Sequence, residues 1–335
     1  MKERALKARR FVLAALAAAP LAALAQAPAR RKRVAFVGFD SMFDGPGGLD
    51  AVVTALERRG FADGRQIDAV RVRIEVRMGE EKGRGLGSLV PMLGRQVPAA
   101  RPDVIVALGS IMAGGLQHVT KTIPIVTSVA DPVAMGLADS LSRPGRNVTG
   151  TSGGLEETSV KAMEFMKVLM PGLARVVIFH DGRPMATRFA ATYERAARSA
   201  GLEPAMVPAF KGNDLVRALQ ALPAHRAQAG LLAWKPPEGG EDFYDIAVAR
   251  RLPLVGASEV DAERGALVSY SAHDPVPFPQ RMAAIVEQVL RGGDPAGIPF
   301  HYPQGFRLVV NRRTARSLGF TVPAELLLRA DRVID

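Results

Sequence analysis

The segment "IPIVTSVADPVAMGLADSLSRPGRNVTG" (123–150) begins with an apolar run that stops abruptly at Asp131. The run "IPIVTSV" has the length and composition of a buried strand, with the polar Ser128 near its end. The following residues predict a helix over 132–142, with Pro132 at its first position. At the end of such a strand, Asp131 can cap the helix, contact a ligand, or do both.

Short apolar runs alternate with helical patterns along most of the chain. In the first half, strands are expected at 33–39, 73–78, 104–108 and 123–129, and helices at 49–59, 86–99 and 111–119. In the second half, strands are expected at 175–179, 204–210, 230–234, 252–256 and 266–270, and helices at 157–170, 184–200, 214–222 and 242–251. Near-continuous apolar strands between amphipathic helices indicate an α/β protein whose parallel sheets are covered on both faces.

The two α/β halves meet near Asn147, which suggests two lobes with a ligand cleft between them. A strongly amphipathic helix at 277–291 follows both halves and is expected to return to the first lobe. A last strand (306–311), a helix (312–318) and a short helix (324–330) close the chain. The N-terminal lobe is therefore assigned to 30–147 plus about 275–295, and the C-terminal lobe to 148–274 plus about 296–335.

Residues 1–25 have the features of a cleavable signal peptide. A basic start is followed by an apolar stretch and a small-x-small site that ends at Ala25, so the mature chain is expected to begin at Gln26. An uncleaved membrane anchor is the alternative, but the apolar stretch is short and contains Pro20. The chain has no cysteine and so offers no lipid-attachment site and no disulfide. These features favour the bacterial periplasm.

The positive charge does not indicate a nucleic-acid-binding protein. Removal of the signal region, which holds five basic residues and one acidic residue, lowers the formal net charge from +11 to +7. Four of the remaining positive charges stand together at 30–33, and no basic face is interleaved with aromatic residues. Solvated basic faces explain the composition better.

No pattern for a metal or a cofactor is present. The five histidines are scattered without i, i+4 spacing, and "GEEKGRGLG" (79–87) fits neither GxGxxG nor a P-loop. The segment "GTSGG" (150–154) does match the GxSxG pattern of serine hydrolases, with Ser152 as nucleophile. The partners available to Ser152 in chain order are Asp181, Asp242 or Asp274, and His273 or His301. The strand before Ser152 is too short for a nucleophile elbow, so the sequence favours a protein that is not an enzyme.

Two long segments resemble signatures of the ABC-transporter substrate-binding protein family. They are "TIPIVTSVADPVAMGLADSLSRPGRNVTG" (122–150) and "FRLVVNRRTARSLGFTVPAELLLRADRVID" (306–335). Shorter matches are "VKAMEFMKVLMPGLARV" (160–176) and "GALVSYS" (265–271). The resemblance implies a type I periplasmic-binding-protein fold: two Rossmann-like lobes, joined by a multi-strand hinge, close on a small solute. It also implies a monomer that delivers its solute to an ABC permease and ATPase complex at the inner membrane.

Some relatives in this family bind aromatic amino acids, which makes an amino acid or related carboxylate the leading solute class. Within that resemblance, the ligand contacts are expected at Ser110, Ser128 and Asp131 of the first lobe and at Asp181, Trp234 and Tyr270 of the second. Ser110, at the start of a helix, would receive a carboxylate, and Asp131 or Asp181 would pair with an ammonium group. Trp234 and Tyr270 would form aromatic walls, although Trp234 could equally belong to the core.

Departures from the family pattern bear on the ligand. "FDSMFDGPGGLD" (39–50), "FHDGRP" (179–184) and "AWKPPEGGEDF" (233–243) differ from the loops of relatives, and each follows an expected strand. The ligand can therefore differ from that of the aromatic-amino-acid binders. A sensory binding domain of the same fold is the main alternative to a transport protein.

Overall fold

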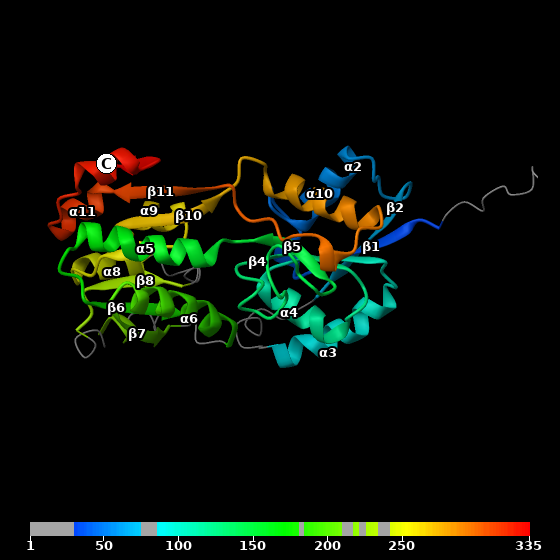
Figure 1. Ribbon diagram of the computed structural model, residues 1–335, viewed down its shortest axis with the longest axis horizontal. Coiled ribbons are helices and arrows are strands. Elements are labelled where there is room, and N and C mark those ends of the chain that lie inside the picture. Colours follow the sequence, from blue (N-terminus) through cyan, green and yellow to red (C-terminus); the bar gives the residue numbers. More distant parts are fainter. Residues whose placement is uncertain (1–29, 75–85, 181–183, 210–216, 221–225, 234–241) are drawn as a thin grey trace, which may run out of the picture. The chain divides into compact units, whose positions relative to one another are not determined.

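Two β-sheets, each flanked by helices, make up the fold (Figure 1). The computed structural model describes residues 30–74, 86–180, 184–209, 217–220, 226–233 and 242–335, and every structural statement below concerns these residues. The chain from Lys32 to Asp335 forms one compact unit. The predicted signal peptide and most of the helix expected at 214–222 lie outside the described residues.

The first sheet has five parallel strands in the order β2-β1-β3-β4-β5. The strands are β1 (Lys32–Gly38), β2 (Ile67–Arg73), β3 (Val104–Leu108), β4 (Ile125–Val129) and β5 (Val148–Ser152). The helices between them are η1 (Asp40–Met42), α2 (Leu49–Arg58), α3 (Leu86–Ala99) and α4 (Ser110–Val119). Helix α10 (Phe278–Leu290) comes from much later in the chain and packs beside α2.

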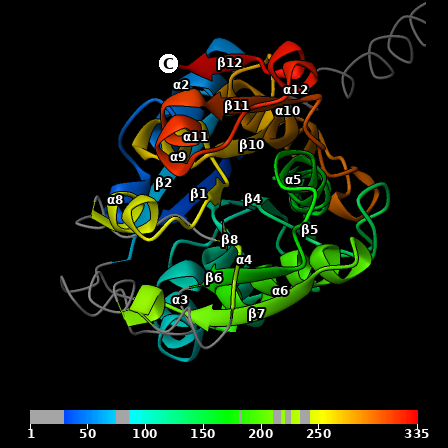
Figure 2. The same ribbon diagram turned by 90° about the vertical axis from the view of Figure 1, so that its left-hand side faces the viewer.

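Both faces of the first sheet are covered at β1, β3 and β4, which is why these strands are mostly apolar. In β1, Ala35 and Val37 pack toward residues of α3 and α4, whereas Val34 and Phe36 pack toward α2 and α10. Figure 2 shows these two helix pairs on opposite sides of β1 and β4.

The second sheet has seven strands in the order β12-β11-β10-β9-β8-β6-β7. Its strands are β6 (Arg175–His180), β7 (Glu203–Pro208), β8 (Ala229–Leu232), β9 (Leu254–Gly256), β10 (Val268–His273), β11 (Gly305–Asn311) and β12 (Arg332–Ile334). Its helices are α5 (Leu155–Leu169), α6 (Pro184–Ser199), α8 (Asp242–Ala249), α9 (Glu259–Arg264), α11 (Arg312–Leu318) and α12 (Ala324–Arg329). Every pair is parallel except β10 with β11. The two-lobed α/β fold is confirmed.

The chain passes between the two sheets three times. The crossing segments are residues 153–154 between β5 and α5, residues 274–277 between β10 and α10, and residues 298–304, which follow η2 (Pro295–Gly297) and lead into β11. The first and third are joined by backbone hydrogen bonds from Ser152 N–H to the His301 carbonyl and from His301 N–H to the Gly150 carbonyl, both 2.8 Å.

Three sequence-based expectations need correction. Strand β2 (Ile67–Arg73) begins before the strand expected at 73–78, most of which lies outside the described residues. The crossing expected at Asn147 comes later, because β5 pairs with β4 and keeps the chain in the first sheet through Ser152. The helix expected over 132–142 is a series of turns, because Gly136 adopts a positive φ of 69° after a single turn.

Candidate functional site

Two cavities border the crossing segments at the carboxyl ends of β4 and β5. The hinge cavity has a volume of about 300 Å³, and the flank cavity has a volume of about 270 Å³. Both lie at or just below the lower end of the usual range for small-molecule sites, about 300–1,000 Å³. Ser152, at the end of β5, lines both cavities.

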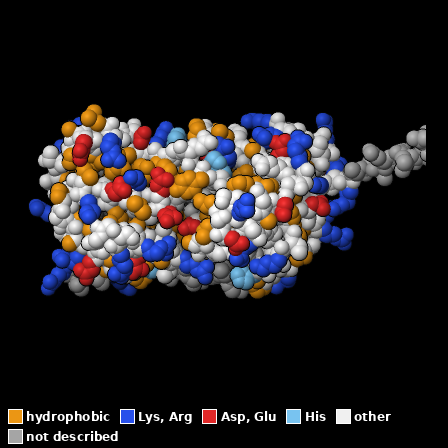
Figure 3. Space-filling model, viewed as in Figure 1, with side chains coloured by type: hydrophobic (Ala, Val, Ile, Leu, Met, Phe, Trp, Pro, Cys, Tyr) orange, Lys and Arg blue, Asp and Glu red, His pale blue; other side chains and the backbone are white. Residues whose placement is uncertain are grey.

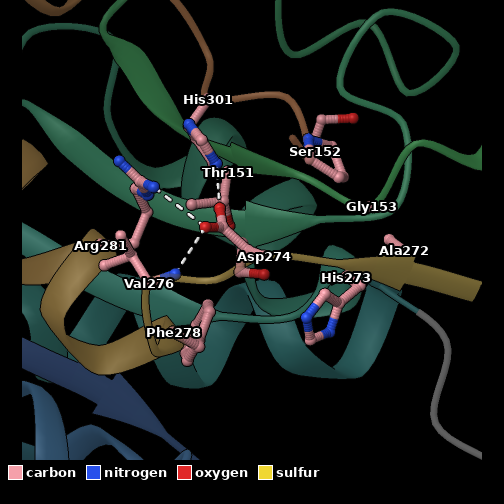
Figure 4. Close-up of a pocket in the computed structure, with 12 residues that line it drawn as sticks. Thr151, Ser152, Gly153, Ala272, His273, Asp274, Val276, Phe278, Arg281 and His301 are labelled. Atoms are coloured by element: carbon pink, nitrogen blue, oxygen red, sulfur yellow. Dashed lines mark hydrogen bonds and ion pairs between the residues drawn. The ribbon is translucent and has the colours of Figure 1, made fainter. Parts of the chain in front are cut away.

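Charged and polar groups from the second and third crossings, and from the strands and helix beside the crossings, line the hinge cavity. They are Ser128, Thr151, Ser152, His273, Asp274, Arg281 and His301, and the main apolar group is Phe278. Asp274 accepts hydrogen bonds from Arg281 Nη2 at 2.9 Å and from Val276 N–H at 3.0 Å, and its second oxygen contacts His301 Nε2 (Figure 4).

These hydrogen bonds control the charge of Asp274. Burial acts to raise the pKa of its carboxyl group, but the hydrogen bonds from Arg281, Val276 and His301 outweigh burial and hold the pKa below its usual value. The carboxylate is therefore ionised at neutral pH. No local sequence pattern predicts this network, because its members are separated along the chain and meet only where the crossings converge.

The GxSxG motif is part of the β5–α5 connection and has a structural explanation. The Ser152 hydroxyl accepts from Gly154 N–H at 3.3 Å and donates to the Ala130 carbonyl at 3.4 Å. In Figure 4 it points away from His301. Gly150 is required because a Cβ there would overlap the Thr127 backbone, and Gly154 ends the crossing with a φ of 66° at the N-terminus of α5. Ser152 therefore lacks the geometry of a nucleophile.

The flank cavity carries charges from segments of both sheets. Asp131 follows β4, whereas Arg195 projects from α6 and Glu156 lies in the first turn of α5. Tyr302 of the third crossing also lines the cavity and donates to Glu157 at 3.2 Å. Burial, together with the nearby Glu157 carboxylate, raises the pKa of Tyr302 to about 12, so it stays a neutral donor.

The three residues predicted in the first half lie close together. The Ser110 hydroxyl accepts from Ala130 N–H at 3.4 Å, between Ser128 and Asp131 in sequence. Ser128 lines the hinge cavity, and Asp131 lines the flank cavity. Asp131 also accepts from the N–H groups of Val133 and Ala134 at 3.1 and 2.9 Å, so it caps a turn where a helix was expected.

Of the three ligand contacts predicted in the second half, only Tyr270 lies within the described residues. Tyr270 lies between the rings of Phe165 and Phe306, at centroid distances of 5.2 and 5.4 Å, and lines neither of the two cavities. Burial raises its pKa, with a further contribution from Glu157. Asp181 and Trp234 lie outside the described residues, so the proposed role of each stays a prediction.

Basic side chains are dispersed on the face shown in Figure 3, where they alternate with acidic ones. Several are paired: Arg71 with Asp50 at 2.7 Å, and Arg332 with Glu263 at 2.6 Å. None of the described helices combines the length and the apolar character needed to cross a membrane.

Two α/β lobes that are linked by three crossings, with polar cavities at the strand ends, define the class of two-lobed binding proteins. Residues 53–334 match the model of the family described as ABC transporter substrate binding protein. The chain belongs to this family, whose members bind solutes and do not catalyse reactions.

Relatives of known structure share the fold along nearly the whole chain. A conserved domain protein from Vibrio cholerae is 26% identical with a TM-score of 0.70, covering 91% of this chain and 100% of that one. An ABC domain from Streptococcus pneumonia, solved in complex with L-Trp, is 21% identical with a TM-score of 0.69 and the same coverage. A "Tyrosine-binding protein" from Clostridioides difficile is 31% identical over 130 residues, which are 38% of this chain and only 34% of that protein.

Proposed function

We propose that this chain captures an amino acid or a closely related carboxylate, with aromatic amino acids as first candidates. The two lobes, the first built on β1–β5 with α10 and the second on β6–β12, close on the solute by a hinge motion. The protein then delivers it to an ABC permease and ATPase at the inner membrane. It works as a monomer in the periplasm. The relatives whose names state L-Trp and tyrosine support this choice of solute.

The observation that carries the proposal is the pair of opposite charges in the flank cavity. Asp131 comes from the end of β4 and Arg195 from α6, so these two opposite charges belong to different sheets, and Glu156 of α5 adds a second carboxylate. An amino acid carries an ammonium and a carboxylate on neighbouring atoms and complements such a pair. One Asp131 oxygen is engaged by the turn, and among the described residues the other has no hydrogen bond.

Two further groups support a carboxylate ligand. Helix α4 begins after Gly109, whose φ of 85° leaves the first turn without a side-chain cap. Backbone N–H groups at such a helix start are well placed to receive a carboxylate, and the Ser110 hydroxyl stands beside them. Ser128 pairs with Leu108 at the end of the neighbouring strand β3, so it adds a second hydroxyl on a rigid strand.

The proposal is tested by the substitution Asp131→Asn in the protein from Gln26 onward. The amide keeps an acceptor for the turn but removes the charge, so binding of L-tryptophan, L-tyrosine or L-leucine should weaken about tenfold or more. The measurement is the ligand-induced rise in the thermal unfolding midpoint, which depends on the ratio of ligand concentration to Kd.

A matched control is available at Asp294, which also precedes a proline and accepts from the N–H two residues on, at 3.0 Å. Asp294→Asn makes the same chemical change away from both cavities, so its ligand response should equal that of the wild type. An Asp131→Asn protein that responds as the wild type does would remove Asp131 from the site.

A further inference from the structure

One small charged cluster, the hinge clasp, made of Asp274, Arg281 and His301, lies where the second and third crossing segments meet. Asp274 lies at the start of the second crossing and Arg281 in the first turns of α10. His301 lies in the third crossing, and its side chain contacts Asp274. The clasp therefore links the second and third crossings through side chains (Figure 4).

The main chain of His301 links the third crossing to the first. His301 and Thr151 form a parallel β-bridge, and the two hydrogen bonds described above, through Ser152 N–H and the Gly150 carbonyl, complete it. His301 thus joins the second crossing, through Asp274, to the third crossing and to the end of β5, directly before the first crossing. A change in the bond between Asp274 and His301 therefore alters the contacts between the chain segments that connect the two sheets.

The clasp is only partly accessible to water. The side chains of Asp274, Arg281 and His301 are 21%, 22% and 18% exposed. Among the described residues, the Nε atom of Arg281 is buried and has no hydrogen-bond partner. Charge pairs in such surroundings are screened by solvent less than pairs on an open surface.

The three members of the clasp differ in side-chain type, and only one of them is a histidine. Arginine stays protonated throughout, and the hydrogen bonds to Asp274 keep it ionised through mild acid. Histidine is the side chain that ordinarily changes charge between about pH 5 and 8, and the contact of His301 with Asp274 is an ion pair only while the imidazole is protonated. The other ionisable groups nearby are His273, which lines the same cavity, and Glu157, which is reached through Tyr302.

We propose that the hinge clasp holds the crossings together in a pH-sensitive way. The interaction is strong while His301 is protonated and weaker once His301 is neutral. The sign follows from the charges: the ion pair stabilises the joined crossings at low pH, and this contribution is lost as the pH rises. Movement of the lobes deforms the crossings. The hinge clasp therefore makes that movement slower at mildly acidic pH. The inference rests on the crossings themselves and holds whichever solute the protein carries.

Hydrogen exchange of the bridging amides tests the proposal without any ligand. The readout is the protection of peptides covering residues 148–154 and 298–304 at pH 5.5 and pH 8.0, corrected for the intrinsic exchange rate at each pH. In the wild type, protection should fall by about threefold or more at the higher pH, as expected for a partly buried ion pair. In His301→Gln, protection should be low and equal at both pH values.

His273→Gln is the matched control, because it removes the other imidazole of the same cavity. It should keep the pH dependence of the wild type. Asp274→Asn retains the imidazole but removes its charged partner, and it should lose the pH dependence. This variant decides the question if His301→Gln does not fold. Wild-type protection that is independent of pH, or a pH dependence that survives in Asp274→Asn, would overturn the proposal.

Discussion

Gly150 lies where the backbones of β4 and β5 come too close for a side chain. Its φ of 149° is also one that other residues rarely adopt. The same residue opens the GxSxG pattern, so strand packing accounts for a motif that is typical of hydrolases. The sequence alone could not separate these two causes, because both require a small residue at the same position.

The substitution Gly150→Ala should therefore destabilise the protein strongly. Overpacking costs about 1–3 kcal/mol, and the positive φ adds about 1–2 kcal/mol, so a loss of about 3 kcal/mol is expected. Gly60 also has a positive φ, of 88°, but a Cβ added there would meet nothing within 4 Å. Gly60→Ala should therefore lose only the second contribution. Urea unfolding of both variants measures the difference, and equal losses would refute the packing argument.

The position of single polar residues at strand ends could be predicted from the sequence. The proximity of side chains that come from different crossings could not. Ser128 and Asp131 stand out because a buried strand stops beside them, and the structure places both at cavities. Asp274, Arg281 and His301 belong to no local motif. Their proximity depends on where the chain crosses between the sheets, and no short stretch of sequence predicts those crossings.

At the scale of elements, period and apolar content predicted α3, β3 and α11 with the bounds that the structure shows. Strand β2 was missed because it lies at the edge of its sheet, where polar residues alternate with apolar ones. The residues after Pro132 have a helical pattern, but one glycine in a left-handed conformation ends the first turn. Such a backbone choice is set by tertiary packing and not by the pattern.

Helix α10 comes late in the chain, after β10 of the second sheet, but it packs on the first sheet. Its apolar stripe packs on the first sheet beside α2, with Met282 fully buried. Met282→Ala should cost about 2–5 kcal/mol of unfolding free energy because it leaves a cavity in that core. Gln288→Ala, on the exposed face of the same helix, should change the stability by less than about 0.5 kcal/mol.

Chemical denaturation of the two α10 variants at equal protein concentration provides the comparison. A small loss for Met282→Ala would mean that α10 contributes little to the first sheet. The assignment of residues 275–295 to the N-terminal lobe would then lose its energetic support.

For the whole molecule, the fold explains why the binding groups are spread over the chain. Solute-binding proteins hold a small molecule between two rigid lobes, and the lobes here are joined by three separate passages. Polar side chains at the end of β5 and in the second and third crossings lie at the same cavities, although they are far apart along the chain. The long family signatures flank this region and made the fold recognisable from the sequence.

The most direct test of the central claim is calorimetric titration of the protein from Gln26 onward with L-tryptophan, L-tyrosine and L-leucine. We predict saturable one-to-one binding of at least one of them, with affinity reduced about tenfold or more by Asp131→Asn. Absence of saturable binding for all three, together with binding of a solute that has no amino and carboxylate groups, would contradict the account.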